Sequence, residues 1–170
     1  AASHYLHQAV ARLAEKKPVI AFIREIGASG GYLASAAATR IVAFPSAVVG
    51  SIGVLSVRPI VQEMLKKLGV SISVTKSGQF KDMGAIYREP TEEEQHREQA
   101  LIDEFYQDFV ATVARSRHLS ESQVREYATG EVFTAKRSRE IGLVDELGDL
   151  DRALDLAAEL GQVPRRYVYV

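Results

Sequence analysis

An unbroken apolar stretch, VIAFI at residues 19–23, is the feature that most constrains how this chain folds. A short apolar run bounded by turn signals is typical of a strand that is buried on both faces of a sheet. It follows a helical pattern at residues 3–17 and precedes a glycine-rich turn at residues 27–31, which leads into a second helical pattern of small residues. Strands that alternate with helices in this way predict an α/β protein with a largely parallel sheet.

The rest of the chain continues this alternation. Further strands are predicted at residues 40–45, 71–77 and 165–170. Helical patterns cover residues 59–68, 91–118, 120–130, 135–142 and 149–160. Two of these helices begin with capping boxes, Thr91-x-x-Glu94 and Ser120-x-x-Gln123. With 170 residues and no linker or repeat, the chain is expected to form a single domain over residues 1–170.

Composition excludes several classes of function. The 21 basic and 22 acidic residues give a net charge of −1, and no basic stripe predicts a nucleic-acid partner. The chain has no cysteine, which excludes disulfides, a thiolate nucleophile and cysteine metal sites. His4, His7, His96 and His118 are scattered, so no metal site is predicted. Without a signal peptide pattern or an apolar segment of about 18 residues, the chain is expected to be soluble.

The glycine-rich turn places Ser29 between a predicted strand and a predicted helix. In one interpretation, Ser29 only caps the helix. In a second, Gly27-x-Ser29-x-Gly31 is a nucleophile elbow, which requires a later histidine; His96 and His118 lie on one helix rather than on a late loop, which argues against it. In a third, a lysine that burial keeps neutral takes the proton of the serine hydroxyl.

Lys76 and Lys81 are the two lysines that suit this third interpretation. Both lie in the loop-like segment KSGQFKDMG, residues 76–84. The other lysines lie on amphipathic or charged helical segments and are Lys16, Lys17, Lys66, Lys67 and Lys136. Asp82 adjoins Lys81, and an ion pair between the two would keep the lysine protonated and useless as a base. These residues alone leave the choice between Lys76 and Lys81 open.

Three motifs occur in order along the chain: ASGGY at residues 28–32, GSIGV at residues 50–54 and KSGxxKD at residues 76–82. Together they resemble the S49 signal peptide peptidases, which are serine proteases with a ClpP/crotonase-type fold. The segment GLVDELG, residues 142–148, is similar to the closing segment of that family. The resemblance covers nearly the whole chain, and the ordered set is specific where a single motif would not be.

The resemblance implies a role for each of four residues. Ser29 falls on the nucleophile, and Lys81, rather than Lys76, falls on the general base. Ser51 falls on the serine that orients this lysine, and the backbone N–H of Gly30 on a donor to the oxyanion. The implied reaction is hydrolysis of hydrophobic peptides, such as cleaved signal peptides, by a Ser-Lys dyad that needs no cofactor and no metal.

The resemblance also implies an assembly and a location. Family members form homo-oligomeric rings or bowls that are membrane-associated, with the catalytic part on the extracytoplasmic side. A strand and a Ser-Pro-Gly-Gly turn, which supplies a second oxyanion donor, precede the first helix in the family, and this chain has no such turn. We therefore expect an N-terminally truncated form that lacks its first strands and the membrane segment. Loss of one oxyanion donor lowers the rate by about 10²–10³-fold.

Two alternatives remain. A crotonase-like acyl-CoA enzyme would share the fold but would need glutamates near its pocket, and Glu25 is the one carboxylate close to the glycine-rich turn. An assembly or scaffold domain that has lost catalysis would fit the missing oxyanion turn, whereas the pair Ser29 and Lys81 argues against it.

Overall fold

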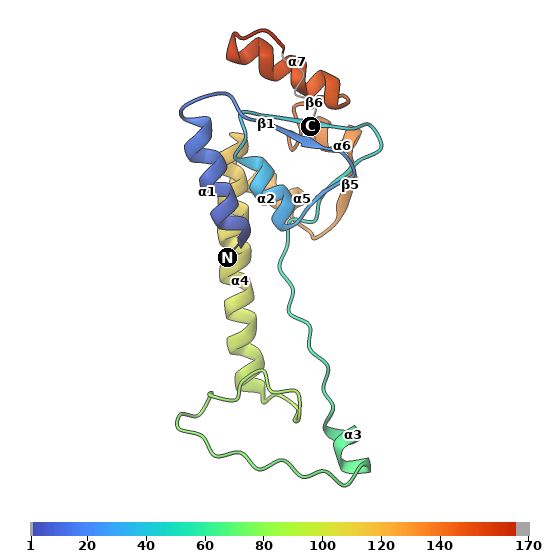
Figure 1. The fold of residues 1–170 in the computed structure, drawn as a ribbon. Coiled ribbons are helices and arrows are strands. Elements are labelled where there is room, and N and C mark those ends of the chain that lie inside the picture. The colour runs from blue at the N-terminus through green and yellow to red at the C-terminus, as the bar shows by residue number, and fades with distance from the viewer. Residues whose placement is uncertain (1, 166–170) are drawn as a thin grey trace. The chain divides into compact units, whose positions relative to one another are not determined.

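The computed structural model describes residues 2–165, which divide into two compact units (Figure 1). The first unit comprises Ala1–Gly53 and Gln107–Val170, and the second comprises Val54–Tyr106. The strand predicted at residues 165–170 lies, except for Arg165, outside the described residues.

Parallel strand pairs form the centre of the first unit. One sheet has the order β1-β3-β6 and is parallel throughout, and the other has the order β2-β4-β5, with β2 and β4 parallel and β4 and β5 antiparallel. The strands are β1 (Ile20–Ile23), β2 (Ile26–Ala28), β3 (Arg40–Ala43), β4 (Val48–Gly50), β5 (Val132–Thr134) and β6 (Glu146–Leu147). The predicted α/β class is confirmed. The short strands β2, β4, β5 and β6 are absent from the sequence prediction, because two or three residues carry no periodic signal.

Helices flank these sheets, and their starts follow local capping chemistry. In the first unit they are α1 (Ala2–Ala14), α2 (Gly30–Ala36), α5 (Glu121–Tyr127), α6 (Ala135–Glu140) and α7 (Leu150–Gly161). Ser120 and Gln123 form the predicted capping box at α5. At α7, the Asp149 side chain accepts the N–H of Arg152 at 2.9 Å. These side chains satisfy N–H groups that a helix cannot satisfy itself, which is why the starts are readable from sequence.

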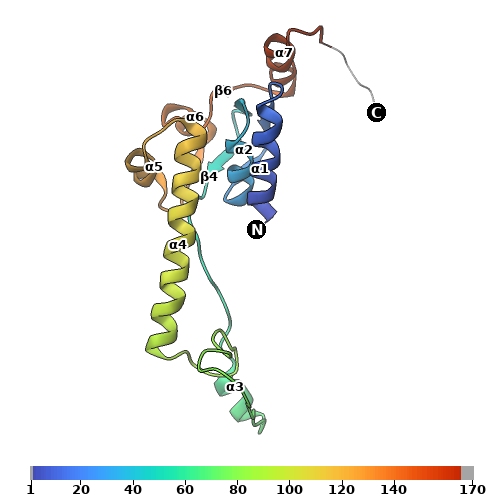
Figure 2. The same cartoon turned by 90° about the vertical axis from the view of Figure 1, so that its left-hand side faces the viewer.

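The packed face of α1 differs from the expected one. The apolar spacing predicts a buried face that includes Leu6 and Leu13, but these side chains are 58% and 41% exposed. Helix α1 lies instead alongside α2 (Figure 2), where Ser3 Oγ occupies the space that a Cβ on Gly30 would need. So close an approach requires short side chains at the contact, and this requirement overrides the apolar pattern.

A buried polar network joins distant segments of the first unit. Tyr32 is fully buried and donates its hydroxyl to the carbonyl of Leu143 at 2.9 Å. The carboxylate of Asp145 accepts the N–H of Ile41 at 2.7 Å and two N–H groups of Arg117 at 2.8 and 3.0 Å. Burial works to raise the pKa of Asp145, but the hydrogen bonds from Arg117 and Ile41 hold it below its ordinary value.

Replacing Asp145 with alanine is expected to lower the free energy of unfolding by about 3–5 kcal/mol, because it strands the charge of Arg117, whose side chain is only 7% exposed. Urea denaturation followed by circular dichroism measures the change. Asp103→Ala, at an exposed carboxylate, serves as the control and should shift stability by no more than about 0.5 kcal/mol. In the unmodified chain, the contribution of Asp145 is present above its unfolded pKa of 3.8 and is lost as the pH falls further. Equal stability of the two variants would contradict this account.

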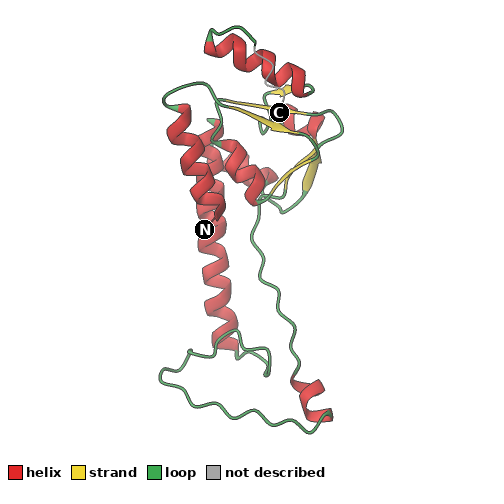
Figure 3. Cartoon of the chain, viewed as in Figure 1, coloured by secondary structure: helices red, strands yellow, loops and turns green. Residues whose placement is uncertain are grey.

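The second unit contains helix α3 (Gln62–Lys67) and the first part of α4 (Glu92–Arg117), whose residues belong to both units. Gly69, with φ at +68°, follows the end of α3. The segments between β4 and α3 and between α3 and α4 are loops (Figure 3). The strand predicted at residues 71–77 is therefore wrong. A strand needs a neighbour for its backbone N–H and C=O groups, and no other described segment pairs with this one.

Candidate active site

Ser29 lies on the turn between β2 and α2 in a strained backbone conformation. Its φ of 50° and ψ of −124° fall in a region that residues other than glycine rarely adopt. Backbone hydrogen bonds hold it there: its N–H donates to the carbonyl of Gly50 at 2.8 Å, and its carbonyl accepts the N–H of Leu33 at 2.9 Å. Such strain persists where the surrounding structure fixes it, and it clusters at functional sites.

The side chain of Ser29 does not cap the helix. Ser29 occupies the N-cap position of α2, but its hydroxyl accepts no helix N–H, so the capping interpretation is wrong. The residue is exposed, which leaves the hydroxyl available for chemistry. Gly30 is the first residue of α2, and the first N–H groups of a helix have no acceptor within it. The turn therefore presents a hydroxyl next to backbone donors.

Ser51 lies beside Ser29 at the same edge of a sheet. The register of the parallel strands β2 and β4 pairs Ala28 with Gly50, so the two serines are the first residues beyond the paired strand ends. Neighbouring strands lie roughly 4.8 Å apart, so the strand ends that precede the two serines are adjacent. Ser51 also has a φ of 50°, and its N–H donates to the carbonyl of Glu131 at 2.6 Å. In open α/β sheets, ligands bind outside the carboxyl ends of the strands.

Gly50, between β4 and Ser51, is required by a close approach of two backbones. Its φ is +119°, and a Cβ on it would lie 2.9 Å from the carbonyl oxygen of Glu131. The two glycines among the β-branched residues of VVGSIGV predict a bulge or a close approach of two backbones, and the structure shows the close approach.

Lys81 belongs to the second unit and lies on a series of turns before α4. Its N–H donates to the carbonyl of Gly78 at 3.3 Å. The residue is exposed, so the burial expected for a neutral lysine is not provided by its own unit. The Lys81 side chain makes no hydrogen bond or ion pair with any of residues 2–165. The ion pair with Asp82 that the sequence suggests is not formed.

Asp82 is held instead by two other cations. Lys76 Nζ donates to Asp82 Oδ1 at 2.5 Å, and Arg88 Nε donates to Asp82 Oδ2 at 3.0 Å. These hydrogen bonds, that of Arg88 foremost, hold the pKa of Asp82 well below its ordinary value. Lys76 also donates to the carbonyl of Gln79 at 2.9 Å. Of the two candidate lysines, Lys76 is therefore engaged and Lys81 has its amine free among the described residues.

The guanidinium of Arg88 connects this turn to the start of α4. It donates to both carboxylate oxygens of Glu94, at 2.5 and 2.7 Å, and Glu94 is only 3% exposed. Glu94 also accepts the N–H of Thr91 at 2.9 Å, and Thr91 Oγ1 accepts the N–H of Glu94 at 3.2 Å, which confirms the predicted capping box. The hydrogen bonds from Arg88 and Thr91 lower the pKa of Glu94 to about 2. The sequence prediction missed Arg88, which carries no motif of its own.

Glu25, the carboxylate that an acyl-CoA enzyme would need, lies on an exposed turn. Its side chain is 71% exposed and forms an ion pair with Arg24 at 2.7 Å.

Residues 2–165 hold no group of three or more His, Asp or Glu side chains placed to bind a metal ion. Nor is any helix within these residues long and apolar enough to cross a membrane.

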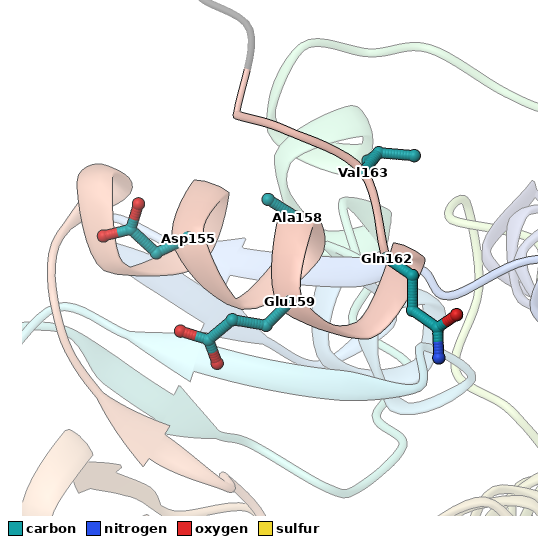
Figure 4. Close-up of a pocket in the computed structure, with 5 residues that line it drawn as sticks. All are labelled: Asp155, Ala158, Glu159, Gln162 and Val163. Carbon is teal, nitrogen blue, oxygen red and sulfur yellow. The ribbon is translucent and has the colours of Figure 1, made fainter.

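A cavity of about 380 Å³ lies at the end of α7 (Figure 4). Its lining consists of Asp155, Ala158, Glu159, Gln162 and Val163. It contains no nucleophile and none of the predicted site residues, and Asp155 is paired with Arg165 at 2.6 Å. This cavity therefore gives no support to a site at the end of α7, and the strained turn at Ser29 remains the candidate site.

Comparison with known protein families and sequences identifies relatives along most of the chain. Residues 11–164 match the model described as peptidase family S49. A candidate protease of Methanocaldococcus jannaschii is 40% identical over 162 residues, which cover 95% of this chain and 52% of the relative. A candidate signal peptide peptidase of Enterococcus faecium is 36% identical over 138 residues, covering 81% of this chain and 40% of the relative. The chloroplast serine protease SPPA of Arabidopsis thaliana is 34% identical and is matched over 24% of its length. The chain thus spans about half, or less, of the length of these relatives.

Solved structures show the same fold. An enoyl-CoA hydratase/isomerase family protein from Silicibacter pomeroyi matches 96% of this chain and 52% of its own, with a TM-score of 0.51 and 18% identity. The enoyl-CoA hydratase of Thermoplasma volcanium matches 96% of this chain and 47% of its own, with a TM-score of 0.50 and 16% identity. At this level of identity the likeness concerns the fold alone. The predicted crotonase-type fold is confirmed.

Proposed function

This chain belongs to peptidase family S49, and we propose that it hydrolyses peptides with a dyad formed by Ser29 and Lys81. The observation that carries the proposal is the turn at Ser29. An exposed serine is held there at a φ of 50° beside the first N–H groups of α2, with Ser51 at the end of the neighbouring parallel strand. Strain at a non-glycine residue on a strand-to-helix turn is typical of a serine nucleophile.

In the proposed mechanism, Ser29 Oγ attacks the carbonyl carbon of the scissile peptide bond while the neutral amine of Lys81 takes the hydroxyl proton. The N–H of Gly30 donates to the oxyanion of the tetrahedral intermediate. Lys81 then returns the proton to the leaving amine, and an acyl-enzyme on Ser29 remains. Water, deprotonated by Lys81, hydrolyses this ester. Ser51 donates or accepts a hydrogen bond that orients the lysine amine.

The choice of Lys81 over Lys76 is supported by contacts within the second unit. Lys76 donates both to Asp82 and to the carbonyl of Gln79, so its amine is already engaged. Lys81 has no competing carboxylate partner among residues 2–165. A general base must give up its own proton before it can accept another, and the free lysine is the better base.

We propose hydrophobic peptides, such as the remnants of cleaved signal peptides, as substrates, and a homo-oligomer as the working assembly. Apolar side chains exposed in the second unit support association with further copies; Leu55 is 79% and Val57 83% exposed. Membrane association of the whole protein, through a segment outside this chain and with the catalytic part on the extracytoplasmic side, belongs to the same proposal.

A fluorophosphonate probe tests the proposal, because it labels only a serine that is activated as a nucleophile. The full-length protein is incubated with the probe, and the labelled peptide is identified by mass spectrometry. We expect the label on Ser29 and its loss in Ser29→Ala. Ser46→Ala, at an exposed serine in the loop after β3, should label fully. A folded protein that is not labelled at Ser29 would contradict the protease assignment and favour an acyl-CoA enzyme or a scaffold domain.

A further inference from the structure

Asp82 and three other charged side chains form a cluster whose charges balance without Lys81. Its members are Lys76, Asp82, Arg88 and Glu94, two cations and two anions joined by ion pairs of 2.5 to 3.0 Å. The Asp82 carboxylate is nearly enclosed, with a side chain that is 12% exposed. Its Oδ2 is also 3.4 Å from the hydroxyl of Tyr87, so both of its oxygens are in use. A fifth charge from Lys81 would have no counterpart here.

We infer that Lys76 and Arg88 act as counter-ions that keep the Asp82 carboxylate from pairing with Lys81. Lys76 is thus a positioning residue. This inference depends on the proposed function only because that function makes Lys81 the general base. Asp82 is the neighbour of Lys81 in sequence, on the same series of turns. An aspartate that paired with Lys81 would favour its ammonium form, which has no lone pair to accept the serine proton.

The two counter-ions differ in what else they hold. Arg88 also binds Glu94, which is buried at the start of α4, so its removal would disturb the fold of the second unit. Among residues 2–165, the partners of Lys76 are Asp82 and one carbonyl, and its side chain is 35% exposed. Removal of Lys76 therefore changes the charge on the cluster with little structural loss. The cluster is left with one negative charge in excess, and Lys81, which makes no hydrogen bond or ion pair with any of residues 2–165, adjoins Asp82 in sequence.

The test compares the reactivity of Lys81 in five forms of the full-length protein: unmodified, Lys76→Ala, Lys76→Arg, Asp82→Asn, and Lys76→Ala with Asp82→Asn. Acetic anhydride acetylates only neutral amines, and mass spectrometry gives the initial rate at Lys81 at pH 8. Lys66, which pairs with Glu63 at 2.7 Å on α3, is the internal reference. We expect Lys76→Ala to slow acetylation of Lys81 by about three- to tenfold, Lys76→Arg to leave the rate unchanged, and the double variant to recover it.

The pattern of recovery separates the inference from its competitors. If Lys76 acted on Lys81 only by direct charge repulsion, Asp82→Asn would raise the acetylation rate by the same factor with Lys76 present as with Lys76→Ala. If Lys76 served only to fold the turn, Asp82→Asn would not restore the rate. Either result, or an unchanged rate in Lys76→Ala, would overturn the inference.

Peptidase kinetics give a second readout. In Lys76→Ala we expect the acid limb of the plot of kcat against pH to move to higher pH by about one unit, with KM unchanged. Adding Asp82→Asn to Lys76→Ala should move the acid limb back. The acetylation rates do not depend on catalysis. Failure of the proposed function would appear as activity that survives Lys81→Ala, whatever the acetylation rates show.

Discussion

Replacing Ser29 with alanine is expected to lower kcat for peptide hydrolysis on the order of 10⁶-fold, the scale found when the nucleophile of a serine protease is removed. The Ser29 side chain makes no helix-capping hydrogen bond, so its removal costs the fold little. A fluorogenic peptide with an aliphatic residue before the scissile bond, assayed with the full-length protein, measures the effect.

The control for this experiment is Ser46→Ala, which removes a hydroxyl from an exposed loop and should retain full activity. Thermal unfolding of both variants checks that they are folded. A Ser29→Ala variant that is folded and cleaves the peptide within tenfold of the unmodified rate would show that the nucleophile lies elsewhere.

Replacing Lys81 with alanine is expected to lower kcat by at least about 10²–10⁴-fold, the range in which general bases contribute. Nucleophile and base act as one unit, so kcat in the double variant Ser29→Ala with Lys81→Ala should fall no further than in Ser29→Ala alone. The same fluorogenic assay, with both single variants and the double variant measured side by side, determines the coupling.

Lys67→Ala is the matched control, since it removes the same charge from an exposed position on α3. Activity that survives in Lys81→Ala, or single effects that simply multiply in the double variant, would refute the dyad. Lys76 would then be the next candidate to test.

Signals that act over three or four residues predict the structure well. The capping boxes at Thr91 and Ser120 each place a helix start, because the donor and the acceptor are close in sequence. The apolar run at residues 19–23 likewise predicts β1, and the glycine-rich turn predicts the start of α2, although residues 26–28 next to that turn form the unpredicted strand β2. The strand predicted at residues 71–77 is wrong, because a strand forms only where a second segment completes its hydrogen bonds.

Contacts between residues far apart in sequence are not predictable from local pattern. Arg117 looks like a cation at the end of a helix, but it is buried against Asp145, which lies 28 residues further along the chain. The candidate site likewise combines residues that the sequence predicts with contacts that it does not. Motif resemblance predicts Ser29, Ser51 and Lys81, whereas the contacts of Asp82 with Lys76 and Arg88 required the structure.

The backbone at Ser29 also restricts which alcohol this turn can carry through evolution. Threonine offers the same hydroxyl chemistry, but a β-branched side chain at a φ of 50° crowds its own backbone. The neighbouring Ser51 has the same φ and the same restriction. A change from serine to threonine, conservative on most surfaces, would here require the turn itself to refold.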